Sequence, residues 1–344
     1  MTAPATFTDK ASAQVWLSTQ QADLERHTWQ DYRTVTPTLN DYAMHVFATK
    51  PYKPGVREDY IDTWNTHIAP HIGSVRVADL SVSQVNAWHS TLQLNCVGTR
   101  TLSKTYSTLR MIMNCAVREE IRQANPCKIA GAGSAHSPER PHLNPDQVQA
   151  LADTIEPRYK ALVLMLAYCL LRKGEATALR RSDFHTDLRT GRWFVSVTRN
   201  VQHMPGGGWR YGSPKTRAGV RTVPVPTRLV PILKEHLSTY TELGQDSLVF
   251  TSSQGQPAYE SGSRAIAKTL KVLGLDYIKG VRVHTHDLRH TGATWLVQAG
   301  ATIPELQRYL GDSSTHAALR YTHASSNATH LTDRLDDLHL SVSA

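Results

Sequence analysis

The chain has 344 residues, 40% of them hydrophobic, and lysine and arginine outnumber aspartate and glutamate 38 to 29. One hydrophobic core rarely serves a chain of this length, so we expect two or three domains. The isoelectric point of about 9.4 favours a partner rich in phosphate, although many basic proteins bind no specific DNA.

Cysteine usage and the N-terminus bear on the compartment. The four cysteines, Cys96, Cys115, Cys127 and Cys169, are far apart and show neither zinc-site spacing nor a disulfide framework. The first residues lack a basic flank followed by an apolar core, and no uncharged apolar run reaches membrane-spanning length. We therefore expect a cytoplasmic protein that has no membrane partner.

The first 35 residues predict one short helix that starts near Thr8 and is too small to be a domain. Residues 36–126 predict a helical domain, because apolar residues recur there at helical spacing. Ser81 and Gln84 have capping-box spacing at the start of one of its helices. The apolar positions are Leu39, Tyr42, Ala43, Val46 and Phe47, then Val56, Tyr60, Ile61, Trp64 and Ile68, then Val85, Trp88 and Leu92, and finally Leu102, Tyr106, Leu109, Met113 and Ala116.

Residues 127–143 are rich in proline, glycine and small polar residues, which is typical of a linker. A second domain, 144–335, should begin where Asn144 and Gln147 can cap a helix. We expect it to be mainly helical, with one small antiparallel sheet made by three runs that the turns 205–208 and 216–219 separate. The expected strands are 193–197, 209–213 and 221–225, and the expected helices are 146–155, 159–179, 227–241, 260–272, 286–298, 303–310 and 315–321.

Four separated segments carry residue types that handle phosphate. They are CLLRKGEATALR (169–180), GSPKTRAGVRTVPV (212–225), HTHDLRHTGAT (284–294) and YLGDSSTHAALRYTH (309–323). Each residue alone has a simpler explanation, such as a solvated helix end or a loop lysine. The four segments in this order are far more specific than any one of them.

In this order and at these separations the segments resemble the active-site boxes of tyrosine recombinases, especially phage integrases, over about residues 36–335. The resemblance implies a helical core-binding domain and a catalytic domain of the tyrosine recombinase fold. It places Arg172, Lys215, His286, Arg289 and Tyr321 in the active site, with Glu175 and His290 in supporting places. No metal or nucleotide cofactor is implied.

The chemistry of strand cleavage asks for the same residue types. Attack on a phosphodiester builds negative charge on two non-bridging oxygens, which the planar guanidinium groups of Arg172 and Arg289 suit. The phenol of Tyr321 can form a covalent 3′-phosphotyrosine that keeps the bond energy for rejoining. Lys215 can protonate the leaving 5′ oxygen, and His286 can accept or share the tyrosine proton.

Asp312 stands where the family usually has a histidine that donates to the phosphate. An ionised carboxylate cannot donate, and beside a phosphate it would be repelled by about 4 kcal/mol at 4 Å and an effective dielectric of 20. We therefore expect Asp312 either to cap a helix that begins near Ser314 or to pair with a catalytic arginine and orient it. His316 is a candidate replacement donor.

Three other classes of protein stay open at this stage. His286 and His290, four residues apart with His284 nearby, could belong to a metallohydrolase, although that motif wants Glu at position 287. Residues 286–310 could form the helix-turn-helix of a DNA-binding regulator. A DNA-relaxing enzyme of the type IB kind would use the same tyrosine chemistry.

The resemblance also implies partners. These are double-stranded DNA attachment sites, a homotetramer that resolves a Holliday junction, a host DNA-bending factor and a directionality factor, all in a bacterial cytosol. We expect the helical domain to contact DNA through Arg100, Lys104 and Arg110. Residues 1–35, with three basic and four acidic side chains, are expected to be a remnant of an arm-binding domain without DNA binding of its own. The C-terminal piece, 327–344, is expected to form a helix that docks on a neighbouring protomer or on its own domain.

Overall fold

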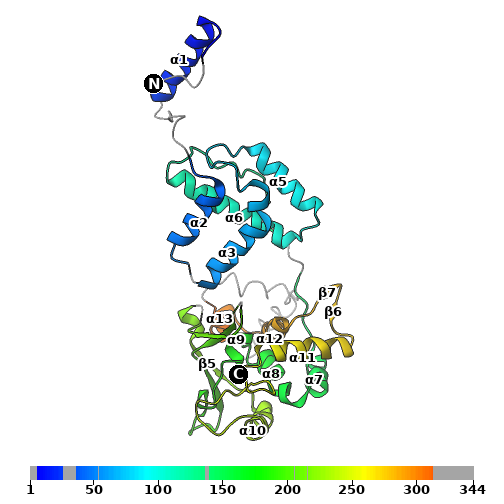
Figure 1. Ribbon diagram of the computed structural model, residues 1–344. Helices are drawn as coiled ribbons and strands as arrows, with labels where there is room; N and C mark the ends of the chain where they lie inside the picture. The colour runs from blue at the N-terminus through cyan, green and yellow to red at the C-terminus, as the bar shows by residue number, and fades with distance from the viewer. Residues whose placement is uncertain are drawn as a thin grey trace, which may run out of the picture. The chain divides into compact units, whose positions relative to one another are not determined.

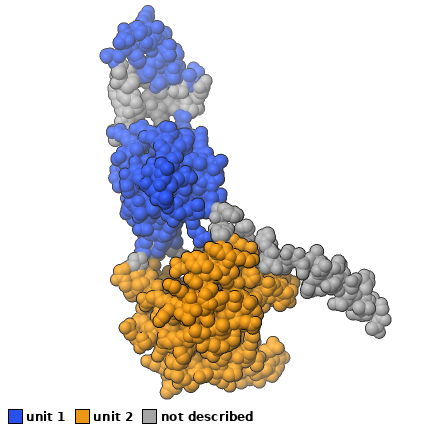
Figure 2. All heavy atoms as spheres, turned by 90° about the vertical axis from the view of Figure 1, so that its right-hand side faces the viewer, with its two compact units in different colours: residues 1–137 blue, residues 138–344 orange. Residues whose placement is uncertain are grey.

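The computed structural model describes residues 6–25, 36–52, 54–135, 139–204, 206–214 and 216–312. The chain divides into two compact units, residues 1–137 and 138–344, shown in different colours in Figure 2. The division falls inside the expected linker. The expected helices 315–321 and 327–340 lie outside the described residues.

The described part of the first unit is helical (Figure 1). Its helices are α1 (Lys10–Glu25), α2 (Leu39–Thr49), α3 (Pro54–His67), α4 (Ala69–Ile72), α5 (Val82–Leu94) and α6 (Thr99–Arg118). Helices α2 to α6 enclose one apolar core that contains most of the residues expected from helical spacing. Val56 is an exception, at 43% exposure. The expected capping box of Ser81 and Gln84 is present at the start of α5.

The expected linker does not run free of the two units. Ile129 donates its backbone N–H to the hydroxyl of Tyr106 on α6, at 2.8 Å, so the first part of the linker packs on unit 1. Leu143 is fully buried in the core of unit 2. The expected capping box of Asn144 and Gln147 opens α7 (Pro145–Thr154).

Unit 2 is built around α8 (Pro157–Tyr168), which is buried along most of its length and packs against α7 and α12 (Thr285–Gln298). The contact between α8 and α12 is close. A Cβ atom added to Gly292 would lie 1.8 Å from the carbonyl oxygen of Ala167, so only glycine fits at this point of α12.

Four further helices complete the described part of unit 2. They are α9 (Lys173–Ala176), α10 (Val230–Thr239), α11 (Tyr259–Val272) and α13 (Ile303–Leu310). Short 3₁₀ turns occur at Arg181–Asp183, Arg217–Gly219 and Thr227–Leu229.

The expected helix over 159–179 is wrong. Helix α8 ends at Tyr168, Leu170 has a positive φ of 52°, and a separate short helix, α9, follows Arg172. The carbonyl oxygen of Leu170 accepts a hydrogen bond from Arg289 on α12. Tertiary contacts of this buried segment therefore override its helical periodicity.

The expected single sheet is also wrong in part. Strands β2 (Trp193–Val197) and β5 (Arg221–Pro224) pair antiparallel, with Val195 opposite Val223, and β1 (Phe184–Thr186) adds a third strand. The run at 209–213 instead forms β4 (Trp209–Gly212), which pairs with β3 (Asn200–His203) in a separate hairpin. A third hairpin joins β6 (Tyr277–Ile278) and β7 (Val281–Arg282).

Candidate active site

Arg172 lies in extended backbone immediately before α9, where it serves as the N-cap position. Its backbone N–H donates to Glu175 Oε2 at 2.9 Å, and its Nη1 donates to Glu175 Oε1 at 2.7 Å. The side chain stays 34% exposed. The break after α8 thus presents this guanidinium at the surface with its direction fixed by Glu175.

Arg289 comes from α12 and is almost fully buried, at 3% exposure. Its Nη1 donates to the carbonyl oxygen of Leu170 at 2.5 Å and its Nη2 donates to that of Leu310 at 2.8 Å. Burial, reinforced by the charge of Arg172, lowers the pKa of Arg289 to about 10, so the group stays charged near neutral pH. The bonds to Leu170 and Leu310 therefore hold the charged guanidinium of Arg289 in one orientation.

Asp312 forms ion pairs with both arginines. One carboxylate oxygen is bound by Nη2 of Arg172, and the other lies 3.3 Å from Nη2 of Arg289. This is the second of the two arrangements expected for Asp312, the one in which it pairs with a catalytic arginine. Ser314, on which the alternative depends, lies outside the described residues.

Glu175 is the centre of the basic cluster and is 2% exposed. Burial alone would raise the pKa of its carboxyl group, but Arg221 and Arg172 outweigh that effect and lower the pKa below 4.5. Oε2 lies 3.0 Å from Nη2 of Arg221 and 3.9 Å from Nη1 of Arg289. Glu175 therefore braces three arginines, in keeping with its expected supporting place.

The sequence prediction missed Arg221. This side chain on β5 is 6% exposed and donates to the carbonyl oxygens of Tyr309 at 2.9 Å and Gly219 at 3.1 Å, besides its ion pair with Glu175. It thereby ties β5 and the end of α13 to the arginine cluster. A charged residue within the alternating run RTVPV was the one signal that could have pointed to it.

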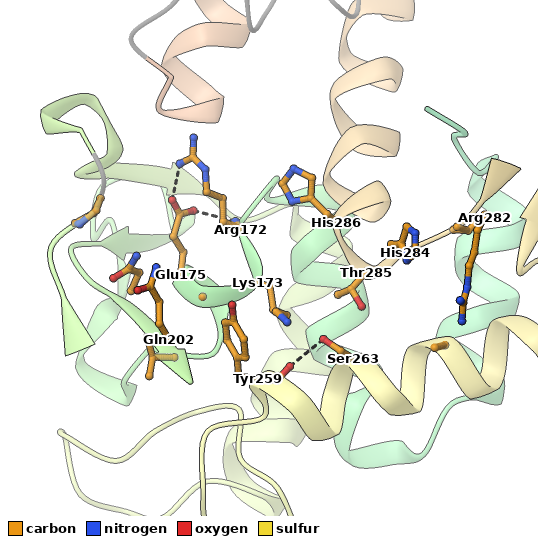
Figure 3. A pocket seen from close by; sticks show the side chains of 16 residues that line it. Arg172, Lys173, Glu175, Gln202, Tyr259, Ser263, Arg282, His284, Thr285 and His286 are labelled. Atoms are coloured by element: carbon orange, nitrogen blue, oxygen red, sulfur yellow. Dashed lines mark hydrogen bonds and ion pairs between the residues drawn. The ribbon is translucent and has the colours of Figure 1, made fainter. Parts of the chain in front are cut away.

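His286 lies in the first turn of α12 and lines the same cavity as Arg172 (Figure 3). Partial desolvation lowers the pKa of its imidazole below 6.5, and the charges of Arg289 and Arg172 act in the same direction. Asp287 opposes this shift. The ring is therefore mainly neutral near pH 7 and able to accept a proton.

His290, four residues further along α12, is half-buried, and burial lowers the pKa of its ring to about 4. It does not line the cavity that His286 and Arg172 share. This position fits a packing or supporting role better than direct contact with a phosphate.

The cavity beside Arg172 has a volume of about 570 Å³. Lys173 places its Nζ 3.7 Å from the ring centroid of Tyr259 on α11, and burial lowers the pKa of this lysine. Arg282 and His284 line the same space (Figure 3). The sequence prediction did not single out Lys173, Tyr259 or Arg282. The basic side chains of Lys173 and Arg282 line this cavity together with Arg172.

Two expected catalytic residues, Lys215 and Tyr321, lie outside the described residues, as does His316. Arg172, Glu175, His286, Arg289 and Asp312 are brought together from three separate parts of the chain. The expected DNA contacts Arg100, Lys104 and Arg110 all lie on the exposed side of α6, where Lys104 is paired with Asp59 at 2.5 Å.

The charges around His286 argue against a metallohydrolase. Arg172 and Arg289 both act on His286, an environment that repels a divalent cation. In the ranges that the structure describes, we find no group of three metal-binding side chains. Helix α12, the first helix of the expected helix-turn-helix, has Arg289, Thr291 and Thr294 buried inside the unit.

Comparison with known proteins gives the same assignment. Residues 141–328 match the model of the phage integrase family. The chain is 32% identical to the prophage phiRv2 integrase of Mycobacterium tuberculosis, over 94% of this chain and 85% of that one. It is 30% identical to the integrase of Mycobacterium phage L5, over 93% and 86% of the two chains.

Solved structures share the fold at low sequence identity. The Tn1549 transposon integrase in complex with transposon right end DNA has a TM-score of 0.74 at 17% identity, and the match covers 89% of this chain and 100% of that one. The lambda integrase dimer bound to a COC′ core site has a TM-score of 0.63 at 15% identity, over 92% and 88%. The described helices include none that is long and apolar enough to cross a bilayer. The chain belongs to the phage integrase family and is a tyrosine-type site-specific recombinase.

Proposed function

We propose that this recombinase cuts DNA with Tyr321 as the nucleophile and with Arg172 and Arg289 as the groups that bind the scissile phosphate. The convergence of the two guanidinium groups on the carboxylate of Asp312 carries the proposal. A carboxylate and the two non-bridging oxygens of a phosphate can each accept two parallel hydrogen bonds from a guanidinium group. The point that Asp312 now fills is thus suited to the phosphate.

The cleavage step moves one phosphoryl group. The phenolic oxygen of Tyr321 attacks phosphorus, the bond to the 5′ oxygen breaks, and a 3′-phosphotyrosine remains. His286 accepts the phenol proton, because its ring, with a pKa below 6.5, is mainly neutral near pH 7. Lys215 protonates the leaving 5′ oxygen. Attack by that 5′ hydroxyl on the phosphotyrosine reverses the step and rejoins the strand.

The wider reaction follows from the same proposal. Four protomers hold two double-stranded attachment sites, exchange one strand of each, form a Holliday junction and repeat the exchange, so that phage or mobile-element DNA is integrated or excised. A host DNA-bending factor and a directionality factor assist in the bacterial cytosol. The C-terminal residues 327–344 dock on a neighbouring protomer and couple assembly to delivery of Tyr321.

DNA is held by both parts of the chain. We assign residues 36–126 to core-site binding, with Arg100, Lys104 and Arg110 on phosphates, and residues 144–335 to catalysis. Binding of this kind weakens steeply with salt. Residues 1–35 are assigned no arm-site binding, and an arm-site footprint that disappears when they are deleted would refute that assignment.

The test uses candidate attachment DNA that is nicked near the cleavage point, so that rejoining is blocked. The wild-type protein should give a detergent-resistant protein–DNA adduct in the presence of a chelator. The Tyr321→Phe variant should bind the DNA with nearly unchanged affinity and give no adduct, because it lacks one hydroxyl group. An adduct formed by Tyr321→Phe would exclude this nucleophile. Relaxation of a supercoiled plasmid without attachment sites would favour a DNA-relaxing enzyme instead.

A further inference from the structure

A short segment at the start of unit 2 is fastened along one side of α12. Arg140 binds the carboxylate of Asp287, the backbone N–H of Leu143 donates to Thr291 Oγ1 at 3.1 Å, and Trp295 Nε1 donates to the carbonyl oxygen of Leu143 at 3.0 Å. The three residues on α12 are spaced by four, so they lie on one face of the helix. Residues 140–143 thus form a strap along this face.

The ion pair between Arg140 and Asp287 is the strongest contact of the strap. Arg140 Nε donates to Asp287 Oδ1 at 2.9 Å, and Nη2 donates to Oδ2, so the pair is bidentate and its plane is fixed. Oδ2 also accepts the backbone N–H of His284 at 2.6 Å. The carboxylate is 2% exposed. Removal of Arg140 would leave this buried charge without its ion-pair partner, which is strongly destabilising.

Asp287 belongs to the same helical turn as His286 and Arg289, the residues proposed to receive the tyrosine proton and to bind the phosphate. The carboxylate of Asp287 caps that turn through His284. Arg289 depends on the position of the turn for its bonds to Leu170 and Leu310. A first turn that opens to hydrate an unpaired Asp287 therefore displaces both active-site side chains.

We propose that Arg140, which the sequence assigns to the linker, is a positioning residue that fixes the first turn of α12, and with it His286 and Arg289, through its bidentate bond to buried Asp287. This inference rests on the proposed roles of His286 and Arg289. Arg140 itself does not line the cavity that His286 and Arg172 share.

The test compares Arg140→Gln, Asp287→Asn and the double variant with the wild-type chain on nicked attachment DNA at saturating protein. Each single variant should form the covalent adduct about tenfold more slowly or worse, because small misplacements of reacting groups are costly. DNA affinity should stay within about twofold. The double variant, in which two amides can pair without a buried charge, should recover much of the lost rate.

Arg180→Gln is the matched control. Arg180 is 36% exposed, as Arg140 is, and also pairs with an aspartate, but it does so through Nη1 alone and its partner Asp246 is 85% exposed. This control should cleave at the wild-type rate. Arg140→Lys keeps the charge and loses the fork, so it should remain slow, and it replaces Arg140→Gln if thermal unfolding shows that the latter does not fold.

The second readout does not depend on cleavage. The charged groups that act on His286 are Arg289, Asp287, Arg172 and Arg140, and the charge of Arg140 lowers the pKa of the ring. In DNA-free Arg140→Gln, the imidazole of His286 should therefore titrate at higher pH by NMR than in the wild type, whereas Arg180→Gln should leave it unchanged. A wild-type chain that forms no adduct would contradict the proposed function, while the titration would still decide the inference. The inference about Arg140 would be overturned if Arg140→Gln cleaved at the wild-type rate and the titration of its His286 were unchanged.

Discussion

The carboxylate of Asp312 forms an ion pair with the guanidinium of Arg172 across a separation of 140 residues. The pair is partly exposed, 22% for Asp312 and 34% for Arg172, so water screens it and its partners can separate when DNA arrives. A carboxylate at this point competes with a phosphate for the same donors. It also holds Arg172 in the orientation that the phosphate needs.

We expect Asp312→Asn to keep measurable cleavage and Asp312→His to be tolerated or to cleave faster. Both changes remove a negative charge that repels the scissile phosphate, and histidine adds the hydrogen-bond donor that the family resemblance leads us to expect at this place. Single-turnover cleavage of nicked attachment DNA measures the effect. Complete loss of cleavage in Asp312→Asn, with folding and DNA binding unchanged, would mean that the carboxylate has a direct catalytic task.

Replacement of either active-site arginine by lysine should severely impair DNA cleavage. An ammonium group cannot reproduce two parallel bonds, and loss of one preorganised donor typically slows catalysis by about 100-fold or more. We expect this loss in the cleavage rate of both Arg172→Lys and Arg289→Lys. Arg289→Lys should also lower the melting temperature, because the buried fork bonds to the carbonyl oxygens of Leu170 and Leu310. Near-normal cleavage by either variant would count against its phosphate role.

The active site was predictable to the extent that its residues lie in compact sequence motifs. Arg172, Glu175, His286 and Arg289 each stand in a motif that the sequence displays, and the structure brings them together with Asp312. The role of Arg221 did not follow from its place in the run RTVPV alone, because its distant partners Glu175 and Tyr309 meet it only after β5 and α13 have packed. The same reason hid the role of Arg140, whose partner Asp287 is 147 residues away.

The fold shows the same limit. Apolar spacing located α2, α3, α5 and α6 and the ends of α7, α11 and α13 to within a few residues, since those segments bury one face each. It failed at Cys169–Leu171, where three consecutive residues are buried and follow a buried helix, so no exposed face marks a helical period. It also could not show that β4 pairs with β3, because that pairing depends on a strand that was not expected.

Stability should depend on the ionisation of Glu175. Its pKa is lowered from 4.5 in the folded chain, so its ion pairs stabilise the fold fully above pH 4.5 and progressively less as the pH falls through the folded value. We expect Glu175→Gln to lose about 3 kcal/mol of unfolding free energy at pH 7. The difference from wild type should shrink below pH 4.5. Urea denaturation at several pH values would show a constant difference if this linkage is wrong.

The contact between α8 and α12 should tolerate no side chain at Gly292. The added Cβ of Gly292→Ala would meet the backbone of Ala167, which cannot move aside as a flexible side chain could. We expect a loss of more than about 3 kcal/mol, at the upper end for overpacked sites, and impaired cleavage because Arg289 lies on the same helix. Gly98→Ala, at a position with nothing within 4 Å, is the control and should leave the melting temperature nearly unchanged. Equal melting temperatures for both variants would contradict the close packing.

The most direct measurement is the identity of the residue that becomes linked to DNA. The wild-type protein is incubated with nicked attachment DNA, the adduct is isolated in detergent and digested, and the linked peptide is sequenced by mass spectrometry. We expect a nucleotide attached through a 3′ phosphate to Tyr321. A nucleotide attached to any other residue, or cleavage without a covalent adduct, would contradict this expectation.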